Sequence, residues 1–365
     1  MDVLKVGVVG CGNVSNVYLE NIPRFENIQV EAVSDLIAEK AHEAAEKVGI
    51  SKILSEEEVF HDESIDIVLD LTPPGGHYAV NMAALKAGKH VYCEKPLAIE
   101  RRQAEELLDV AEEKQLRIGN APDTFLGAGL QTCRKLIEDG QIGRPLSATA
   151  FLLGHGPEGW HPSPEFFYKT GGGPMFDMGP YYLTAFVALF GPVASVAGMT
   201  SSGFDERTVG SGEKKGQKIK VEIPTHISGM LHFEKGPLAT ITTSFDVWKH
   251  NCPRIEVHGT DGSISVPDPN FFDGPVKISR GGDDWEEVPL THSYNENWRA
   301  LGLSDMAAAI STGRPHRASG KLAYHVLDVM HAIHEAAEQK TELEIESTVA
   351  QPAPMPTDLE EGKVD

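Results

Sequence analysis

Long apolar runs are absent from this sequence of 365 residues, and no stretch approaches the ~20 consecutive apolar residues that a membrane-spanning helix needs. Signal-peptide character is also absent from the first residues, which run directly into a strand pattern, so we expect a cytoplasmic protein without a membrane partner. Cysteines are few, and their scattered positions are typical of reduced thiols rather than of a disulfide framework: Cys11, Cys93, Cys133 and Cys252.

Positive charge is scarce. Lysine and arginine number 32 against 54 aspartates and glutamates, which gives a net charge of −22. A field of this sign repels phosphate backbones, so we expect no nucleic-acid partner. Metal-ligand patterns are scarce as well: His331 and His334 lie three residues apart, but no cysteine or carboxylate completes a set, and we predict no metal site.

Residues 1–120 alternate apolar strand patterns with amphipathic helix patterns joined by short links. This alternation predicts a doubly wound parallel sheet, that is, an α/β domain of the Rossmann type. The expected strands are 3–9, 29–33, 65–71, 91–93 and 116–119, and the expected helices are 38–47, 78–87 and 101–114.

A glycine turn follows the first strand. Gly10 and Gly12 would let the backbone approach a pyrophosphate, and Asn13 and Val14 lead into the next helix, whose amides could hold that anion. The third position of the dinucleotide fingerprint is Ser15 instead of glycine or alanine, so the motif is imperfect.

Asp35 stands at the end of the second strand, 23 residues after Gly12. A carboxylate there would bind the adenosine ribose hydroxyls and repel a 2′-phosphate, which favours NAD over NADP. The alternative interpretation is a helix N-cap. Three further residues follow the third strand in a rigid loop over the expected ligand crevice: Thr72, Pro73 and His77.

The strand at 91–93 ends in Glu94, Lys95 and Pro96, and we expect Glu94 and Lys95 to bind the cofactor together with Thr72, Pro73 and His77. Pro96 removes an amide donor and fixes φ, so the chain must leave the sheet there. A lysine at the carboxyl end of a parallel strand points into the crevice where such sheets bind ligands. The alternative is an exposed loop lysine beside a glutamate, without a chemical role.

Residues 121–348 predict a second domain of α+β type with a large, open, mostly antiparallel sheet, because several period-two strands are separated by glycine-containing turns. An uncovered sheet face commonly pairs with another subunit, so we expect a homodimer or homotetramer formed through it. The proline-rich, acidic residues 349–365 predict a disordered tail.

The second domain also holds candidate substrate ligands. Asp177 and Tyr181 are four residues apart after three glycines and would share one helix face, although a cap and a core aromatic are the alternatives. Aromatic and imidazole groups suit a sugar or polyol, while surface turns are equally compatible with each of them. The remaining candidate substrate residues are Asn120, His155, Trp160, His161 and His325.

Four stretches together resemble the glucose–fructose oxidoreductase/inositol dehydrogenase (Gfo/Idh/MocA) family: the glycine turn, Thr72-Pro73 with His77, the run from Ala87 to Pro96, and the three glycines before Asp177. The resemblance covers nearly the whole chain and is most specific in the run that ends in Glu94-Lys95-Pro96. It implies a nicotinamide-binding Rossmann domain coupled to an α/β domain with an open sheet.

The resemblance further implies that Lys95 contacts the reacting hydroxyl beside the nicotinamide ribose and that Asp177 binds the substrate. The family usually has a histidine four residues after that aspartate as acid/base, and here the position is Tyr181. The asparagine expected after Thr72-Pro73 is Pro74, which removes one expected cofactor hydrogen bond.

We therefore expect an NAD(H)-dependent oxidoreductase that transfers hydride at a hydroxyl or keto carbon of a neutral sugar, sugar derivative or inositol. Residues 150–182 contain no arginine, which favours a neutral substrate over an anionic one. Two alternatives remain open: a dehydrogenase of a non-sugar substrate such as a dihydrodiol, and a catalytically silent sensor that binds NAD(H).

Overall fold

The computed structural model describes residues 3–365, which divide into two compact units. The first unit consists of the chain up to Ala128 together with Thr291–Tyr324 and Pro352–Asp365. The second consists of Gly129–Leu290 and His325–Gln351. The predicted domains are continuous in sequence, whereas these units interleave, because the chain returns to the first unit twice.

The first unit contains a five-stranded sheet in the order β2-β1-β3-β4-β5, in which every pairing is parallel. Its strands are β1 (Leu4–Val9), β2 (Ile28–Ser34), β3 (Ile67–Asp70), β4 (His90–Cys93) and β5 (Ile118–Asn120). Its helices are α1 (Ser15–Asn21), α2 (Ala38–Val48), α3 (Glu56–His61), α4 (Pro74–Lys86), α5 (Arg101–Glu113), α8 (Leu301–Thr312) and the 3₁₀ turns η1 (Ile22–Arg24) and η2 (Thr124–Leu126). The predicted parallel sheet is confirmed.

Buried β-branched and apolar residues explain this sheet. Val8, Leu69 and Val91 are completely buried, as expected for parallel strands covered by helices on both faces. The short helix α3 was not predicted, although the sequence carries its start signal. Ser55 and Glu58 form a capping box in which the Ser55 side chain accepts from the Glu58 N–H and the Glu58 carboxylate accepts from the Ser55 N–H.

The second unit is built on a nine-stranded sheet in the order β15-β14-β13-β12-β6-β11-β10-β7-β16, in which the β6–β11 pairing is parallel and the others are antiparallel. Its strands are β6 (Pro145–Leu153), β7 (Val193–Ser201), β10 (His226–Phe233), β11 (Leu238–Ser244), β12 (Ile255–Gly259), β13 (Gly262–Val266), β14 (Val276–Arg280), β15 (Glu286–Val288) and β16 (Leu343–Glu344). The predicted open, mostly antiparallel sheet is confirmed.

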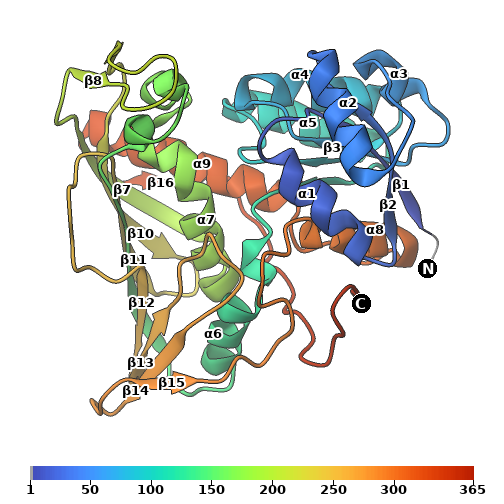
Figure 1. Cartoon of the computed structure of the whole chain (residues 1–365). Helices are drawn as coiled ribbons and strands as arrows, with labels where there is room; N and C mark the ends of the chain where they lie inside the picture. Colours follow the sequence, from blue (N-terminus) through green and yellow to red (C-terminus); the bar gives the residue numbers. More distant parts are fainter. Residues whose placement is uncertain (1–2) are drawn as a thin grey trace. The chain divides into compact units, whose positions relative to one another are not determined.

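Helices cover one face of this sheet (Figure 1). They are α6 (Ala128–Glu138), α7 (Gly173–Phe190) and α9 (Gly320–Gln339), and α7 packs against β6, β10 and β11. The opposite face exposes Met199, Met230 and Leu238. Along residues 3–365, no helix combines the length and the apolar character needed to cross a bilayer.

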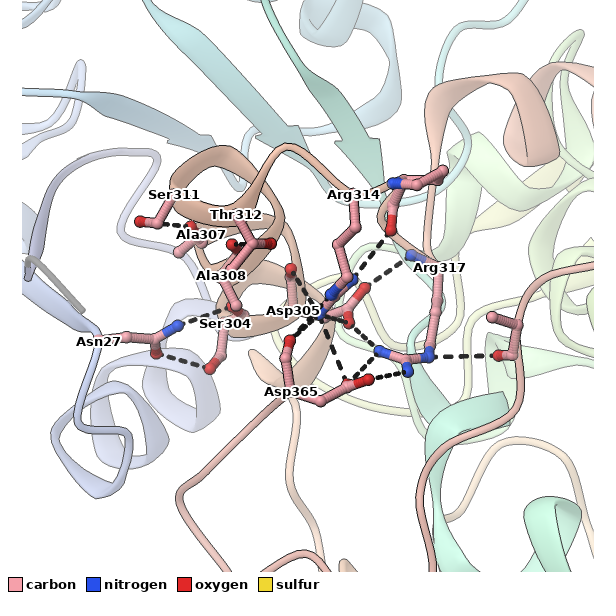
Figure 2. A network of polar contacts seen from close by, with 12 residues as sticks. Asn27, Ser304, Asp305, Ala307, Ala308, Ser311, Thr312, Arg314, Arg317 and Asp365 are labelled. Carbon is pink, nitrogen blue, oxygen red and sulfur yellow. Dashed lines mark hydrogen bonds and ion pairs between the residues drawn. The ribbon is translucent and has the colours of Figure 1, made fainter.

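Residues 352–365 belong to the first unit and are bonded to it by specific side-chain contacts. The sequence predicted a disordered tail at residues 349–365. Figure 2 shows their anchor: Asp305 on α8 accepts hydrogen bonds from Arg314 and Arg317, and Arg317 also donates to Asp365, at 2.9 Å. Met355 and Val364 are buried as well. The composition of the tail does not reveal these contacts, because their partners lie some 50 residues earlier in the chain.

Candidate cofactor and substrate site

The glycine turn after β1 has the backbone geometry that a close approach requires. Gly10 has φ +96°, and a Cβ there would lie 2.7 Å from the Leu71 carbonyl carbon, so only glycine fits. Gly12 has no neighbour within 4 Å of the position of a Cβ, which leaves open space beside the backbone where a phosphate could approach. Ser15 replaces the third fingerprint glycine, and its hydroxyl donates to the Gly12 carbonyl at 2.7 Å. Asn13 and Val14 complete the turn before α1.

Asp35 is fixed by two backbone amides. One carboxylate oxygen accepts the Cys11 N–H at 2.7 Å, and the other accepts the Ile37 N–H at 2.8 Å. The alternative role as N-cap of α2 does not apply, because the N-cap position is Ile37 and receives no side-chain cap. The partly exposed carboxylate is therefore held in one orientation at the carboxyl end of β2. Burial of the Cys11 thiol, followed by the charge of Asp35, raises the pKa of that thiol to about 11.

The loop after β3 is tied to the loop after β4 by His77. This ring is completely buried, and its nitrogens lie 2.8 Å from the Thr72 carbonyl oxygen and 2.6 Å from the Pro96 carbonyl oxygen. Both nitrogens are therefore engaged by the protein, and we assign His77 to loop positioning instead of direct cofactor binding. Thr72 is itself held by Asp70, whose carboxylate accepts from its N–H and its hydroxyl. Pro73 sets the start of α4.

Asp70, His77 and Cys93 are buried, and their ligand atoms lie within 4.8 Å of one another, close enough to hold a metal ion. Each member already has partners in the protein: Thr72 for Asp70, two carbonyl oxygens for His77, and the Glu94 carbonyl oxygen for Cys93 at 3.1 Å. Burial raises the pKa of Asp70, opposed by the charge of His77. We assign this cluster to the architecture of the strand ends and propose no metal there.

The backbone of Lys95 is held by Glu94. One Glu94 carboxylate oxygen accepts the Lys95 N–H at 3.0 Å, and the other accepts the Tyr18 hydroxyl at 2.8 Å. Burial, followed by the charge of Glu94, raises the pKa of Tyr18 well above its usual value, so Tyr18 remains a hydrogen-bond donor. Asn120 donates to the carbonyl oxygens of Cys93 and Glu94 at 2.9 and 3.0 Å. These contacts clamp the end of β4 and leave the Lys95 side chain partly exposed.

Two predicted ligands belong to this clamp. Glu94 was predicted to bind the cofactor and Asn120 the substrate; both are buried, and both Glu94 carboxylate oxygens and the Asn120 amide nitrogen are bonded at this strand end. We assign both to positioning, and direct contact with a ligand stays a prediction. Tyr18 was missed by the sequence analysis, because an aromatic residue on a short helix gives no sign of a partner 76 positions later.

In the second unit, α7 carries Asp177 and Tyr181 one turn apart. The N-cap of α7 is Gly172, so Asp177 is not a helix cap; it is partly exposed, whereas Tyr181 is mostly buried. Tyr182 is completely buried, as is typical of a packing residue. The glycines before the helix serve close packing: a Cβ at Gly173 would lie 2.7 Å from Ile223.

The candidate substrate histidines have different environments. His155 stacks on Trp248, and His161 contacts Trp160 and Phe166 edge-on; these rings lie at the surface of the second unit.

His325 was predicted to bind the substrate, and its surroundings favour a structural role. It is completely buried, its Nε2 accepts the Val193 N–H at 3.0 Å and its Nδ1 lies 2.9 Å from the Ser347 hydroxyl. With both nitrogens bonded inside the fold, His325 is a structural residue. Its position on an amphipathic helix was compatible with either role.

Two family models match the chain. The oxidoreductase family with an NAD-binding Rossmann fold matches residues 4–121, and the GFO/IDH/MocA C-terminal domain matches residues 130–265. Among curated proteins, myo-inositol 2-dehydrogenase of Thermotoga maritima is 23% identical over 350 residues, which cover 95% of this chain and 100% of that protein.

Solved structures match with the same extent. An NAD-binding oxidoreductase from Klebsiella pneumoniae has a TM-score of 0.83 at 20% identity and covers 94% of this chain and 99% of its own. Levoglucosan dehydrogenase in complex with NADH and levoglucosan has a TM-score of 0.79 at 23% identity, with coverage of 94% and 99%. These identities establish the shared fold, and the family models establish the family. The chain belongs to the GFO/IDH/MocA family of oxidoreductases and carries that family's NAD-binding Rossmann domain.

Proposed function

We propose that this protein is an NAD(H)-dependent dehydrogenase or reductase that transfers hydride at a hydroxyl or keto carbon of a neutral sugar, sugar derivative or inositol. The observation that carries the proposal is the clamped end of β4, where Glu94 holds the backbone of Lys95 in a member of this family. Inositol and levoglucosan dehydrogenases among the relatives support the substrate class.

The first unit fits a dinucleotide on three counts: the left-handed Gly10, the open space at Gly12 and the fixed carboxylate of Asp35. The nicotinamide supplies an acceptor for hydride when it is bound. Asp35 would bind the ribose hydroxyls with its remaining lone pairs and disfavour a 2′-phosphate by charge repulsion, so we propose NAD as the preferred cofactor. A relative that uses NADP belongs to the same family, which makes this preference a property to be measured.

We propose three side-chain roles in the reaction. Lys95 donates a hydrogen bond to the reacting oxygen and favours its negative charge as the proton leaves. Tyr181 takes up or returns that proton as the general acid/base. Asp177 accepts a hydrogen bond from an adjacent hydroxyl and so orients the carbinol.

A neutral substrate is supported by the composition of residues 150–182, which contain no arginine. The two alternative functions, a dihydrodiol dehydrogenase and a catalytically silent sensor, make different predictions. A dihydrodiol dehydrogenase would oxidise an aromatic diol and leave polyols unchanged, and a sensor would bind NADH without turnover of any substrate.

We further propose that the protein acts in the cytoplasm as a homodimer or homotetramer and that copies pair through the uncovered face of the nine-stranded sheet. Met199, Met230 and Leu238 on that face are exposed, and apolar exposure of this kind is typical of an interface. Light scattering on the wild type and on Met230→Glu tests this pairing: the variant should have a lower mass, and an unchanged mass would contradict it.

The decisive test of Tyr181 is the variant Tyr181→Phe, with Tyr182→Phe as the matched control. We expect kcat of Tyr181→Phe to fall by about 10²–10⁴ with NADH affinity retained, since general acid–base catalysis contributes this much. Tyr182→Phe should stay near the wild-type rate because its hydroxyl lies in the core. Near wild-type turnover by Tyr181→Phe would remove Tyr181 from the acid/base role and return His155 and His161 as candidates.

A further inference from the structure

Three segments of the second unit form a small lobe, which we call the aromatic lobe: residues 154–172, 203–224 and 245–253. The hairpin of β8 (Glu206–Thr208) and β9 (Lys218–Lys220) packs on two 3₁₀ turns, η3 (Pro157–Gly159) and η4 (Pro164–Tyr168). The lobe has its own buried cluster, which consists of Phe167, Tyr168, Val209, Ile219 and Phe245.

Arg207 holds the three segments of the aromatic lobe together. It is almost completely buried and donates to the Glu158 carboxylate at 2.9 Å, to the Phe245 carbonyl oxygen at 2.6 Å and to Asp246. Its charge is therefore neutralised inside the lobe. Counted with these pairs, the whole lobe is balanced, with seven lysines and arginines against seven acidic residues, in a chain of net charge −22. The lobe is a rigid, electrically neutral part of an acidic protein.

Exposed rings gather on this lobe. Four of the six exposed tryptophans and phenylalanines of the described chain belong to it, and they form two pairs, each with a histidine between its members. His155 stacks on Trp248 with ring centroids 3.3 Å apart and meets Phe204 edge-on. Trp248 is nevertheless 80% exposed, so its second face is open to solvent. His161 stands in the same way between Trp160 and Phe166.

The aromatic lobe also contains buried polar atoms without hydrogen-bond partners in the described chain. Nδ1 of His155, Nδ1 of His250 and Oγ of Ser211 are buried side-chain atoms without a hydrogen-bond partner in the described chain. Burial, followed by the charge of Arg207, lowers the pKa of His155, so its ring is neutral at pH 7. Buried polar atoms usually have partners, and each exception calls for an explanation such as a ligand.

We propose that the aromatic lobe binds a neutral pyranose ring and serves as a subsite for glycosides or oligosaccharides beyond the ring that is oxidised. The C–H face of a pyranose can pack on the face of Trp248 that His155 leaves open. The absence of net charge suits a neutral ligand. This proposal rests on the proposed function, because the ring would belong to the substrate of the same enzyme.

The lobe adjoins the helix that carries a proposed substrate ligand. A Cβ at Gly172 would overlap the Phe166 carbonyl oxygen, so η4 packs directly on the start of α7, and Asp177 follows five residues later. A substrate of two or more rings held by Asp177 would extend along this end of the second unit.

Binding is tested by calorimetric titration of the intact protein with methyl β-D-glucopyranoside, maltose and cellobiose, on wild type, Trp248→Ala and Trp248→Phe. Trp285→Ala is the matched control, because Trp285 is also exposed but lies outside the lobe. We expect Trp248→Ala to weaken binding of at least one disaccharide by 10-fold or more, Trp248→Phe to retain most of it, and Trp285→Ala to stay within 2-fold of wild type.

Equal affinities for wild type and Trp248→Ala, or no binding of any probe to wild type, would overturn the proposal. So would a fall in oligomeric mass of Trp248→Ala with unchanged sugar affinity, since the lobe would then be an interface between copies of the chain. These titrations need no turnover. Dehydrogenase activity on a monosaccharide without binding at the lobe would contradict the subsite alone, whereas sugar binding at the lobe without NAD turnover would contradict the proposed function.

Discussion

The two units hold their candidate functional side chains in different ways. In the first unit, carboxylates at strand ends accept backbone N–H groups: Asp35 holds Cys11, and Glu94 holds Lys95. In the second unit, Asp177 and Tyr181 project from one helix, and the other candidates are rings on loops of the aromatic lobe.

The difference matches the two proposed roles, cofactor binding by the first unit and substrate binding by the second. NAD and NADP differ by a single phosphate, so the ligands of the shared part of a dinucleotide can be fixed by backbone bonds at the ends of parallel strands. A substrate varies between members, and side chains on loops can change without disturbing the sheet that supports them. Substitutions in the first unit test whether its ligands are rigid and generic.

Replacing Lys95 should have the largest effect, because it is the one residue of the first unit to which we assign a part in the chemistry. We expect Lys95→Met to lower kcat by about 10³ or more, within the range of positioned proton-transfer and electrostatic groups, and to change the Kd of NADH little. Steady-state kinetics and a fluorescence titration with NADH measure both. The control is Lys86→Met on the exposed end of α4; equal activity of the two variants would refute the assignment.

Substitution of Asp123 tests how much a buried carboxylate in the first unit lowers the stability of the fold. It is buried and accepts the N–H groups of Ala300 and Gly302, both at 3.0 Å, and burial raises its pKa to about 6. Because the pKa of Asp123 is higher in the folded than in the unfolded protein, its carboxyl group stabilises the fold at a pH below the unfolded pKa of about 4. This contribution to stability is lost as the pH rises through the folded pKa of about 6. Asp123→Asn keeps an acceptor oxygen without a charge, so its stability relative to wild type should increase with pH.

Urea unfolding at pH 4, 5, 6 and 8 measures this trend, with the exposed Asp284→Asn as control. Two pKa units correspond to a gain of roughly 3 kcal/mol at most, since each unit is worth about 1.4 kcal/mol. A stability difference between Asp123→Asn and wild type that does not change with pH would contradict the assignment of a costly buried charge.

Asp35 tests whether the cofactor ligands are generic. Asp35→Ser removes the carboxylate that is expected to bind the ribose, and hydrogen bonds to charged groups contribute about 1.5–3 kcal/mol, which corresponds to roughly 10- to 100-fold. We expect kcat/KM for NAD to fall by about that factor relative to kcat/KM for NADP. An unchanged ratio of the two values would exclude Asp35 as the selective residue.

Tyr18 and Glu94 test the clamp by a double-mutant cycle. Tyr18→Phe leaves one oxygen of Glu94 without its donor, and Glu94→Ala removes the acceptor of both the Tyr18 hydroxyl and the Lys95 N–H. We expect kcat to fall about 10-fold in Tyr18→Phe and further in Glu94→Ala, with a coupling energy near 1 kcal/mol.

A readout independent of catalysis accompanies the cycle. Hydrogen exchange at the Lys95 amide should accelerate in Tyr18→Phe at an unchanged Tm, because that amide donates to Glu94. Unchanged exchange, or strictly additive effects of the two substitutions on kcat, would show that Tyr18 does not position Lys95.

Much of the fold could be predicted from the sequence, because the signals are local. The parallel strands, the glycine turn and the strand end at Lys95 each follow from a short pattern of apolar residues, glycines and proline. The structure differs where a residue's environment comes from distant parts of the chain. Tyr18 meets Glu94 after 76 residues, His325 is enclosed by Val193 and Ser347, and the tail is held by Arg317.

The candidate site divides in the same way. Asp35 keeps its predicted role as a proposal because its carboxylate is partly exposed, whereas we assign Glu94, Asn120 and His77 to positioning because they are buried and bonded within the fold. A sequence motif indicates that such a residue is needed at a strand end, but it does not distinguish a residue that touches the ligand from one that holds its neighbour.

The most direct measurement is a single-turnover reaction in which the purified protein is mixed with NAD and a panel of monosaccharides and inositols and the absorbance of NADH is followed. The account predicts that at least one neutral polyol gives NADH in an amount equal to the protein and that Lys95→Met abolishes this phase. Tight NADH binding without reduction of NAD by any polyol, at any pH tested, would contradict the proposed dehydrogenase activity.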